Sequence, residues 1–357
     1  SGIWLNLLKK EIGFMIKKID IKGFKSFDSV SLELNNFTLL AGRNSMGKTS
    51  VIQAVFAMLQ DGNNPFRGEY MNIGSVNELL NAIVRSSEIE FNMEYEYDGK
   101  IDRVSKKITK QGTDSEGKTE KKIKLIYCSS DRIGVKDTYE KYLGDEIVIG
   151  KNCDYVFHYL NAYDEMELDK DRDFVYDSKS KLTFGGQVNF WLNKIMGYQV
   201  KAREIEKTEF IQVLYRNEKV LFEMRPKNVG TGVTYITELI IAALACKEGD
   251  LLIIENPEIH LHPSGQSELV EFLAFLAQCG VQIIVETHSD HIYNGIRKSI
   301  RLDQIDSDKV NIYSFTQDTK GCSIPIKIPV NGDGKALNNA EGFFDQIDKD
   351  LNVILGW

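Results

Sequence analysis

The stretch Gly42-Arg43-Asn44-Ser45-Met46-Gly47-Lys48-Thr49 decides the fold class of this chain. Two glycines separated by four residues and followed by lysine and threonine form the phosphate-binding loop pattern, in which backbone N–H groups surround an anion. The lysine of such a loop reaches the outer phosphates, and the threonine hydroxyl binds Mg²⁺. The following helix adds the positive end of its dipole. We therefore predict that residues 42–49, together with Ser50, bind ATP with Mg²⁺.

The residues on either side of this loop fit a strand before it and a helix after it. Phe37 to Leu40 is an apolar run of strand length. After the loop, apolar residues recur at the spacing of one helix face, and they are Val51, Ile52, Val55, Phe56 and Leu59. Strand, loop and helix thus follow one another as a phosphate loop requires.

The composition is that of a soluble globular protein, with 42% hydrophobic and 27% charged residues. No apolar run approaches the roughly 20 residues of a membrane-spanning helix. The N-terminal Gly2 to Leu8 is too short and wrongly flanked for a signal peptide. We expect a cytoplasmic protein without membrane association. The five cysteines are odd in number and form no C-x-x-C pair, so we expect reduced thiols.

The formal net charge of −8 would repel nucleic acid, so a contact with DNA or RNA requires a local basic patch. Lysines gather in one part of the sequence, and they are Lys106, Lys107, Lys110, Lys118, Lys121, Lys122 and Lys124. We favour a solvated hairpin face as their explanation, and nucleic-acid binding stays open as the alternative.

Hydrophobic patterns divide the chain into four expected parts. Residues 15–136 form a β lobe with the phosphate loop, and residues 137–200 form a helical insertion. Residues 201–330 form a second lobe, and residues 331–357 form a C-terminal helical segment. The insertion lacks the sustained heptads of a coiled coil, so we expect no coiled-coil arm.

Within the β lobe we expect two strands between residues 16 and 40, with a turn at Asn35-Asn36. Alternating apolar residues predict further strands over 88–97 and 101–109, and 111–117 is expected to be a polar tip. These short alternating strands are typical of an antiparallel sheet.

In the second lobe, apolar strands alternate with helices. Strands are expected over 251–255 and 281–286, and helices over 234–246 and 268–279. This alternation predicts a parallel sheet at the core of an α/β fold.

A carboxylate closes the first of these strands. Glu255 follows four apolar residues, and phosphate-loop enzymes place at such a strand end the acid that holds Mg²⁺. Thr49 and Glu255 are therefore the expected magnesium residues.

The segment Glu255-Asn256-Pro257-Glu258-Ile259-His260-Leu261-His262-Pro263 resembles the Walker B and D-loop segment of one ATPase group. This group contains the ABC-class ATPases related to RecF, the OLD proteins and the heads of structural-maintenance-of-chromosomes (SMC) proteins. Further segments resemble its opening, Q-loop, signature, switch-histidine and C-terminal motifs, and they are Phe24–Phe27, Tyr127–Gly134, Asn228–Thr234, Thr287–Asp290 and Gly342–Asp345. The resemblance implies an α/β P-loop NTPase of the ABC-ATPase head type, with a mixed β-sheet, an antiparallel β lobe and a helical insertion.

The same resemblance implies that two copies of the chain sandwich two ATP molecules. Each ATP would lie between the phosphate loop of one subunit and the signature helix of the other, where Gly230, Gly232 and Thr234 are found. Glycines before a helix let the backbone approach the γ-phosphate, and the Thr234 hydroxyl is able to donate to it. His262 joins these nucleotide-binding residues, and we expect a homodimer or a higher homo-oligomer.

The chain departs from the ABC pattern at Asn256. Most such ATPases carry there a glutamate that orients or deprotonates the attacking water, and an amide is not a base. General-base assistance contributes about 10² to 10⁴ in rate, so either Glu258 replaces the missing acid or hydrolysis is slow. The resemblance also implies that His288 contacts the γ-phosphate. Glu258, His288 and Asn256 are therefore the expected catalytic-site residues.

A metal centre is an alternative interpretation of one histidine-rich region. Its candidate ligands are His260, His262, Glu286, His288, Asp290 and His291. The H-x-H spacing is compatible with a metal, but no second ligand pair of defined geometry is evident. We prefer the ATPase interpretation, which explains most of these positions.

Only 69 residues follow His288, and we expect that number to be too small for an appended Toprim nuclease. The leading hypothesis is an ATP-binding sensor or assembly subunit of a bacterial anti-phage defence system of the Septu or PARIS kind. Its effector would be a separate protein, an HNH or Toprim nuclease. The alternatives are a RecF-like DNA-repair ATPase and a nucleotide-locked scaffold with little turnover.

Overall fold

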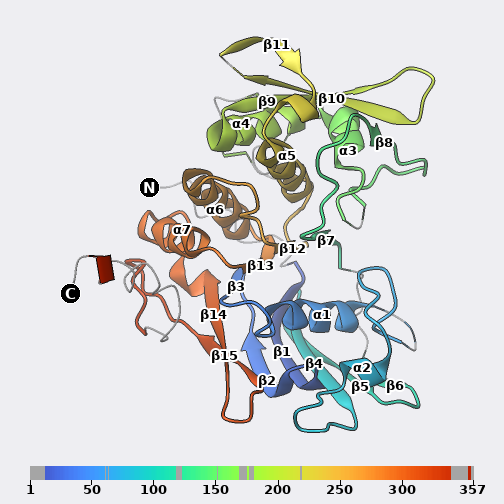
Figure 1. Ribbon diagram of the computed structural model, residues 1–357, viewed down its shortest axis with the longest axis vertical. Helices are drawn as coiled ribbons and strands as arrows, with labels where there is room; N and C mark the ends of the chain where they lie inside the picture. The colour runs from blue at the N-terminus through green and yellow to red at the C-terminus, as the bar shows by residue number, and fades with distance from the viewer. Residues whose placement is uncertain are drawn as a thin grey trace.

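A six-stranded β-sheet lies at the centre of the structure (Figure 1). The computed structural model describes residues 13–60, 62, 64–117, 123–150, 152–168, 175–176, 181–217, 219–338 and 353–354. The central strands follow the order β15-β14-β3-β13-β12-β7, and all are parallel except β15. Their bounds are Phe37–Ala41 for β3, Leu125–Cys128 for β7, Leu251–Glu255 for β12, Gln282–Thr287 for β13, Val310–Gln317 for β14 and Ser323–Lys327 for β15. The predicted parallel core is confirmed.

Helices cover both faces of this sheet, as its apolar strands require. They are α1 (Lys48–Leu59), α5 (Thr231–Leu244), α6 (Pro263–Gln278) and α7 (Asp290–Arg301). Successive residues of a strand point to opposite faces. On β12, Leu252 and Ile254 accordingly face the core formed with α5, α6 and α7. Leu251 and Ile253 face the core formed with α1.

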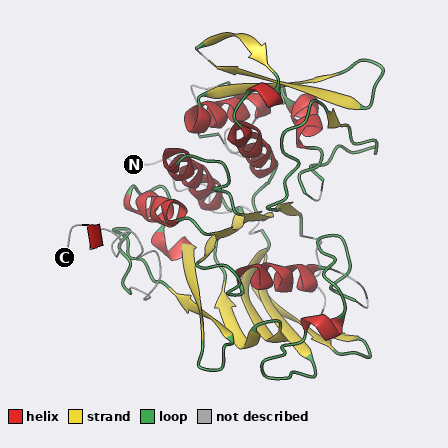
Figure 2. Ribbon diagram, in the orientation of Figure 1, coloured by secondary structure: helices red, strands yellow, loops and turns green. Residues whose placement is uncertain are grey.

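An antiparallel sheet packs against α1 and forms the N-terminal β lobe (Figure 2). Its strand order is β2-β1-β4-β5-β6. The bounds are Met15–Phe24 for β1, Phe27–Glu33 for β2, Ile89–Tyr97 for β4, Lys100–Ile108 for β5 and Thr113–Glu116 for β6, with a short helix α2 at Val76–Leu79.

Two local predictions in this lobe are wrong. The chain before the phosphate loop forms three strands rather than two, because a tight turn at Lys25 and Ser26 joins β1 to β2. Lys25 has a φ of 50°, which lysine seldom adopts, so the sequence carries no signal for this turn. The expected polar tip over 111–117 contains β6, which pairs with β5 although its side chains are mostly exposed.

A third sheet and two helices form the end of the structure opposite the β lobe (Figure 1). The strands are β8 (Tyr139–Glu140), β9 (Tyr198–Glu204), β10 (Phe210–Asn217) and β11 (Val220–Met224), and β10 pairs with each of the others. Helices α3 (Val156–Tyr163) and α4 (Phe184–Met196) pack against α5. The longest helix among the described residues, α6, has 16 residues, so the described chain contains no coiled-coil arm.

The described part of the C-terminal segment contradicts the helical prediction for residues 331–338. These residues form turns, because the Asn331 side chain accepts hydrogen bonds from the N–H groups of Asp333 and Lys335. Helix is present at 353–354, and the Gly342–Asp345 motif lies outside the described residues. Among those that are described, no helix combines the length and hydrophobicity needed to cross a membrane. Within the part of the chain that the structure describes, 3₁₀ turns lie at Pro226–Asn228 and Ser307–Lys309.

Candidate nucleotide and magnesium site

The phosphate loop joins β3 to α1 through a backbone that few residue types adopt easily. Gly42, Ser45 and Gly47 have positive φ values of 126°, 61° and 102°. A side chain at Gly47 would also approach the Phe27 ring to 2.7 Å. Backbone conformation and packing therefore both require glycine at this position. Since α1 begins at Lys48, its first N–H groups and its dipole are directed at the loop.

Lys48 is the buried cation of this loop. Its Nζ donates to the carbonyl oxygens of Gly42 at 3.0 Å and Arg43 at 2.7 Å, and lies 3.4 Å from Nδ1 of His288. Burial lowers the pKa of Lys48, and the nearby Glu286 counteracts this shift. A positive charge is thus held where the phosphate-loop pattern requires one.

The other loop residues differ in exposure. Arg43, Asn44 and Ser45 are exposed, Met46 is half-buried, and Ser50 is buried in the first turn of α1. The tip of the loop is therefore open to solvent. The part that these side chains take in nucleotide binding stays a prediction.

Two carboxylates lie side by side at the ends of parallel strands, next to the phosphate loop. Glu255 ends β12 and is paired in register with Glu286 of β13. The Thr49 hydroxyl donates a hydrogen bond to Oε1 of Glu286 at 2.8 Å. The backbone N–H of Ser130 donates to Oε2 of Glu255 at 3.3 Å. In this structure Thr49 is therefore linked to Glu286, whereas the sequence predicts that it acts with Glu255.

Glu286 contacts Thr49, and the magnesium prediction did not include it. A signal was present, because Glu286 follows an apolar strand in the same way as Glu255. Burial raises the pKa of Glu286 to about 7, and the charge of Glu255 adds to this effect, whereas the Thr49 hydrogen bond opposes it. Its Oε2 is buried and lacks a hydrogen-bond partner in the described chain. Two carboxylates and a hydroxyl are oxygen ligands that suit Mg²⁺, so these residues fit the cation.

Glu258 and His288 form one hydrogen-bonded unit at the end of β13. Glu258 accepts from the Thr287 hydroxyl at 2.8 Å and from the backbone N–H of His288 at 2.7 Å. Nδ1 of His288 lies 2.8 Å from the carbonyl oxygen of Gly42. Partial burial lowers the pKa of His288, and the charge of Lys48 acts in the same direction. A neutral imidazole with its proton on Nδ1 is therefore favoured. The structure brings both predicted residues to the phosphate loop.

Asn256 adopts a left-handed backbone conformation directly after Glu255. Its φ is 44°, and its N–H donates to the carbonyl oxygen of Glu286 at 2.8 Å. The guanidinium of Arg132 donates to the carbonyl oxygens of Glu255 at 3.4 Å and Asn256 at 3.2 Å. Arg132 also lies over the Tyr235 ring, 5.6 Å from its centroid. Asparagine tolerates this backbone conformation better than most residues. Arg132, for which the sequence predicts no role, connects the turn to α5.

The signature segment packs largely within its own subunit. Gly230 caps α5 and has open space around it. Gly232 is buried, and a side chain there would come within 2.3 Å of the His260 carbonyl oxygen, so packing within the subunit explains this glycine. Thr234 is fully buried. Its side chain faces the interior of the subunit, and the contact of its hydroxyl with ATP on a second subunit stays a prediction. The exposed threonine of the first turn is Thr231.

His262 lies at the beginning of α6. It is the N-cap residue of that helix, and its Nδ1 lies 2.9 Å from the Ser264 hydroxyl oxygen. A nucleotide-binding role for His262 stays a prediction. The histidine-rich region does not form, within the described residues, any group of three His, Cys, Asp or Glu side chains suited to hold a metal.

The candidate basic patch loses one of its lysines in the structure. Lys106 is buried, and its Nζ donates to the carbonyl oxygens of Ala57 and Gln60. It holds the end of α1 and does not belong to a solvated hairpin face. Lys107 forms an ion pair with Glu88 at 2.8 Å. Three further lysines of the candidate patch, Lys118, Lys121 and Lys122, lie outside the described residues.

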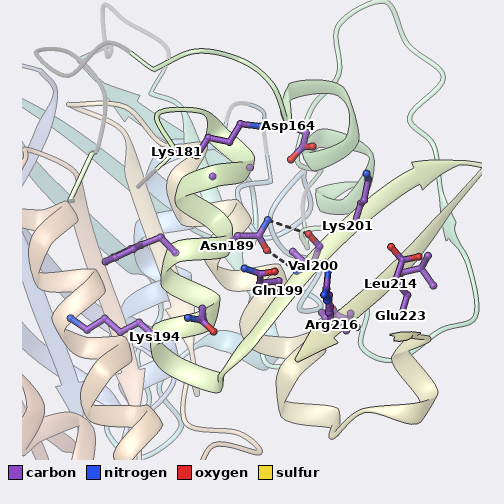
Figure 3. A pocket seen from close by; sticks show the side chains of 15 residues that line it. Asp164, Lys181, Asn189, Lys194, Gln199, Val200, Lys201, Leu214, Arg216 and Glu223 are labelled. Carbon is purple, nitrogen blue, oxygen red and sulfur yellow. Dashed lines mark hydrogen bonds between the residues drawn. The ribbon is translucent and has the colours of Figure 1, made fainter. Parts of the chain in front are cut away.

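A cavity of about 670 Å³ lies between α4 and the strands β9, β10 and β11 (Figure 3). Its lining includes polar groups that are engaged within the protein. Asn189 bonds to both backbone groups of Val200, and Lys194 pairs with Glu271. The lining contains no residue of the phosphate loop, so this cavity is not the ATP site.

The fold is similar to that of SMC head domains. An SMC head bound to the C-winged helix domain of ScpA shares 13% identity at a TM-score of 0.56, over 88% of this chain and 97% of that one. An SMC head with an extended coiled coil, bound to the C-terminal domain of ScpA from Pyrococcus furiosus, shares 11% identity at a TM-score of 0.55, over 96% and 100%. The SMC head from Thermotoga maritima shares 14% identity at a TM-score of 0.50, over 88% and 99%. The chain thus has an SMC-head-like α/β P-loop fold.

No curated protein matches the chain at a significant level. Residues 305–354 match a family described as a protein of unknown function, DUF3696. Residues 37–294 match a family described as "AAA domain, putative AbiEii toxin, Type IV TA system". This second match spans well over half of the chain and includes the phosphate loop, Glu255 and His288. The chain therefore belongs to this AAA domain family.

Proposed function

We propose that this protein binds and hydrolyses ATP as an ABC-type ATPase and that two copies pair around the nucleotide. One observation carries the proposal, namely that two segments distant in sequence, the phosphate loop with the start of α1 and the end of β13, are joined by side-chain contacts. Lys48 and Thr49 begin α1, Glu286 is the last residue but one of β13, and His288 follows that strand. A phosphate loop, an oxygen-rich cation site and a group facing the outer phosphate are the parts that phosphoryl transfer to water needs.

Each of these residues has a separate task in the proposed reaction. Lys48 and the N–H groups at the start of α1 bind the outer phosphates. Thr49 and Glu255 hold Mg²⁺, which when bound neutralises charge that develops on the phosphate oxygens. His288 faces the outer phosphate, and Glu258 fixes the position of His288 through its backbone N–H.

The biological system is a further part of the proposal. We infer a sensor or assembly subunit of a bacterial anti-phage defence system with a separate HNH or Toprim nuclease. The resemblance to the ABC-class ATPases related to RecF and the OLD proteins, a group found in defence systems such as Septu or PARIS, supports this role. The family description, which names a putative toxin of a toxin–antitoxin system, is compatible with it. Co-purification with a nuclease encoded beside the gene would test this part of the proposal.

A nucleotide-locked scaffold is the second candidate, and Asn256 is the observation that favours it. An amide at the usual base position slows hydrolysis while leaving nucleotide binding intact. A phosphate-release assay on the parent protein distinguishes the hydrolysing ATPase from the scaffold. Measurable turnover favours the ATPase, and absence of detectable turnover favours the scaffold. The RecF-like alternative receives less support, because the buried Lys106 does not contribute to a basic surface.

Nucleotide binding itself is tested by Lys48→Ala. We expect affinity for a fluorescent ATP analogue to fall on the order of 100-fold, because a buried charge-assisted contact to the phosphates is lost. Lys107→Ala removes a lysine from the surface of the β lobe and serves as the matched control. Unchanged affinity in Lys48→Ala would contradict the assignment of the loop.

A further inference from the structure

Glu286 has one carboxylate oxygen that the hydrogen bonds of the described chain do not explain. Its Oε1 accepts the Thr49 hydroxyl at 2.8 Å, whereas its Oε2 is buried and has no hydrogen-bond partner in the part of the chain that the structure describes. The whole residue is only 5% exposed. Because a buried polar oxygen without a donor or a cation is costly, we expect this atom to have a partner in the working protein.

The surroundings of this oxygen favour a cation as that partner. Glu255 lies next to Glu286 in the parallel register, so two acids share one end of the sheet. Lys48 is not the missing partner, since it donates to the carbonyl oxygens of Gly42 and Arg43. In the proposed site its charge binds the nucleotide phosphates. Carboxylates and a hydroxyl in one small region form an oxygen-ligand set of the kind that Mg²⁺ prefers.

We propose that Glu286 is a third protein group of the magnesium site and acts with Thr49 and Glu255 on the cation that accompanies ATP. This inference rests on the proposed function, because the nucleotide phosphates supply the remaining oxygens. The usual phosphate-loop site takes its acid from one strand, whereas here β12 and β13 each supply one. The bound cation then also fixes the strand that leads into His288, which couples metal binding to the position of that histidine.

Metal affinity is the quantity that tests this inference. Mn²⁺ replaces Mg²⁺ and is titrated by electron paramagnetic resonance into the full chain saturated with a non-hydrolysable ATP analogue. Glu286→Gln keeps the size of the side chain and an acceptor for Thr49 but removes the charge. We expect Mn²⁺ affinity to fall about 10- to 100-fold, as for other groups that support a metal site.

Glu258→Gln is the matched control for this titration. It removes the same charge from the same region, but both oxygens of Glu258 already accept protein hydrogen bonds. Its Mn²⁺ affinity should therefore stay close to that of the parent. Equal affinity in Glu286→Gln and the parent, or an equal loss in both variants, would overturn the inference.

Binding of a fluorescent ATP analogue in the presence of EDTA separates this inference from the proposed function. We expect Glu286→Gln and the parent to bind the metal-free analogue equally well. A parent protein that binds the analogue neither with Mg²⁺ nor in EDTA contradicts the proposed function, and this inference with it. If Glu286→Gln does not fold, Glu286→Asp replaces it, since that change keeps the charge but withdraws the carboxylate by one methylene. We then expect several-fold weaker Mn²⁺ binding, and unchanged binding would contradict the inference.

Discussion

Under the proposed function, single residues at the ends of β12 and β13 would set the rate at which bound ATP is hydrolysed. Asn256 occupies the position of the usual acid and is held in a left-handed turn by hydrogen bonds to Glu286 and Arg132. Glu258 faces His288 and uses both of its oxygens as hydrogen-bond acceptors. Glu258 therefore positions His288, and it serves as a base only if one of these hydrogen bonds opens.

We expect Glu258→Gln to lower the rate of phosphate release by about 10² or more while leaving ATP affinity nearly unchanged. Glutamine keeps the size of the side chain but is not a base, and its NH₂ group faces the N–H of His288 or the hydroxyl of Thr287. A phosphate-release assay together with a nucleotide titration measures both quantities. A variant that turns over like the parent would leave Glu258 with a structural role only.

Two variants at Asn256 test whether a carboxylate at this position assists hydrolysis, and the second of them controls for strain in the backbone. Asn256→Glu introduces the usual carboxylate and should raise the basal rate. Glutamate tolerates the φ of 44° less well than asparagine, so both stability and rate have to be compared with Asn256→Gln. The glutamine variant carries the same backbone strain without the charge. Equal rates in the two variants would show that a carboxylate at this position does not assist hydrolysis.

At the scale of elements, α5 is the helix through which a second subunit would reach the nucleotide. Gly230 and Thr231 form its exposed start, whereas Gly232 and Thr234 are buried inside the subunit. Of these residues, Gly230 has a φ of −60° and open space, so a side chain fits there without rearrangement. Gly230 is therefore the position at which pairing is tested without disturbing the fold.

We expect Gly230→Asp to leave ATP binding by the single subunit intact and to block ATP-dependent pairing. A carboxylate at the start of α5 would face the γ-phosphate of the partner's ATP, and repulsion between like charges in an interface costs several kcal/mol. Gly230→Ala adds a side chain without charge and should still pair. Light scattering with and without ATP measures the outcome. Pairing that survives Gly230→Asp would show that this helix start does not face the partner's nucleotide.

Element types were predictable from sequence where the pattern of apolar residues was unambiguous. The apolar runs of β3, β12 and β13 and the phosphate loop were recognised, since buried parallel strands read as continuous apolar segments. The inward orientation of the Thr234 side chain could not be predicted from the sequence. Helix α5 is buried on nearly all sides, so its sequence offers no polar face that would show which way a residue points. The partner of Thr49 was also missed, since sequence order does not show which of two acids lies closer to a hydroxyl.

At the scale of the whole molecule, the central sheet separates two hydrophobic cores. One core joins α1 to the β lobe, and the other joins helices α3 to α7 to the third sheet. The second core encloses an acid, because Glu238 of α5 is fully buried. Burial raises the pKa of Glu238 to about 8, and the charge of Arg132 opposes this shift. At neutral pH the folded protein therefore keeps this carboxyl protonated.

This buried acid makes the stability of the fold depend on pH. In the unfolded chain the carboxyl ionises near its ordinary pKa of about 4.3. Between that value and about 8 the folded state binds more protons than the unfolded state. The contribution of Glu238 to the free energy of unfolding is therefore fully present below the unfolded pKa, and it is lost as pH rises through the folded pKa.

We expect Glu238→Gln to be more stable than the parent at pH 8.5, by on the order of 1 kcal/mol or more, and to differ less at pH 5. Glutamine retains the shape of the protonated acid and cannot ionise. Denaturant unfolding at several pH values measures the difference, with the exposed Glu209→Gln as a control that should follow the parent. Parallel pH profiles for Glu238→Gln and the parent would mean that this carboxyl does not hold its proton in the folded state.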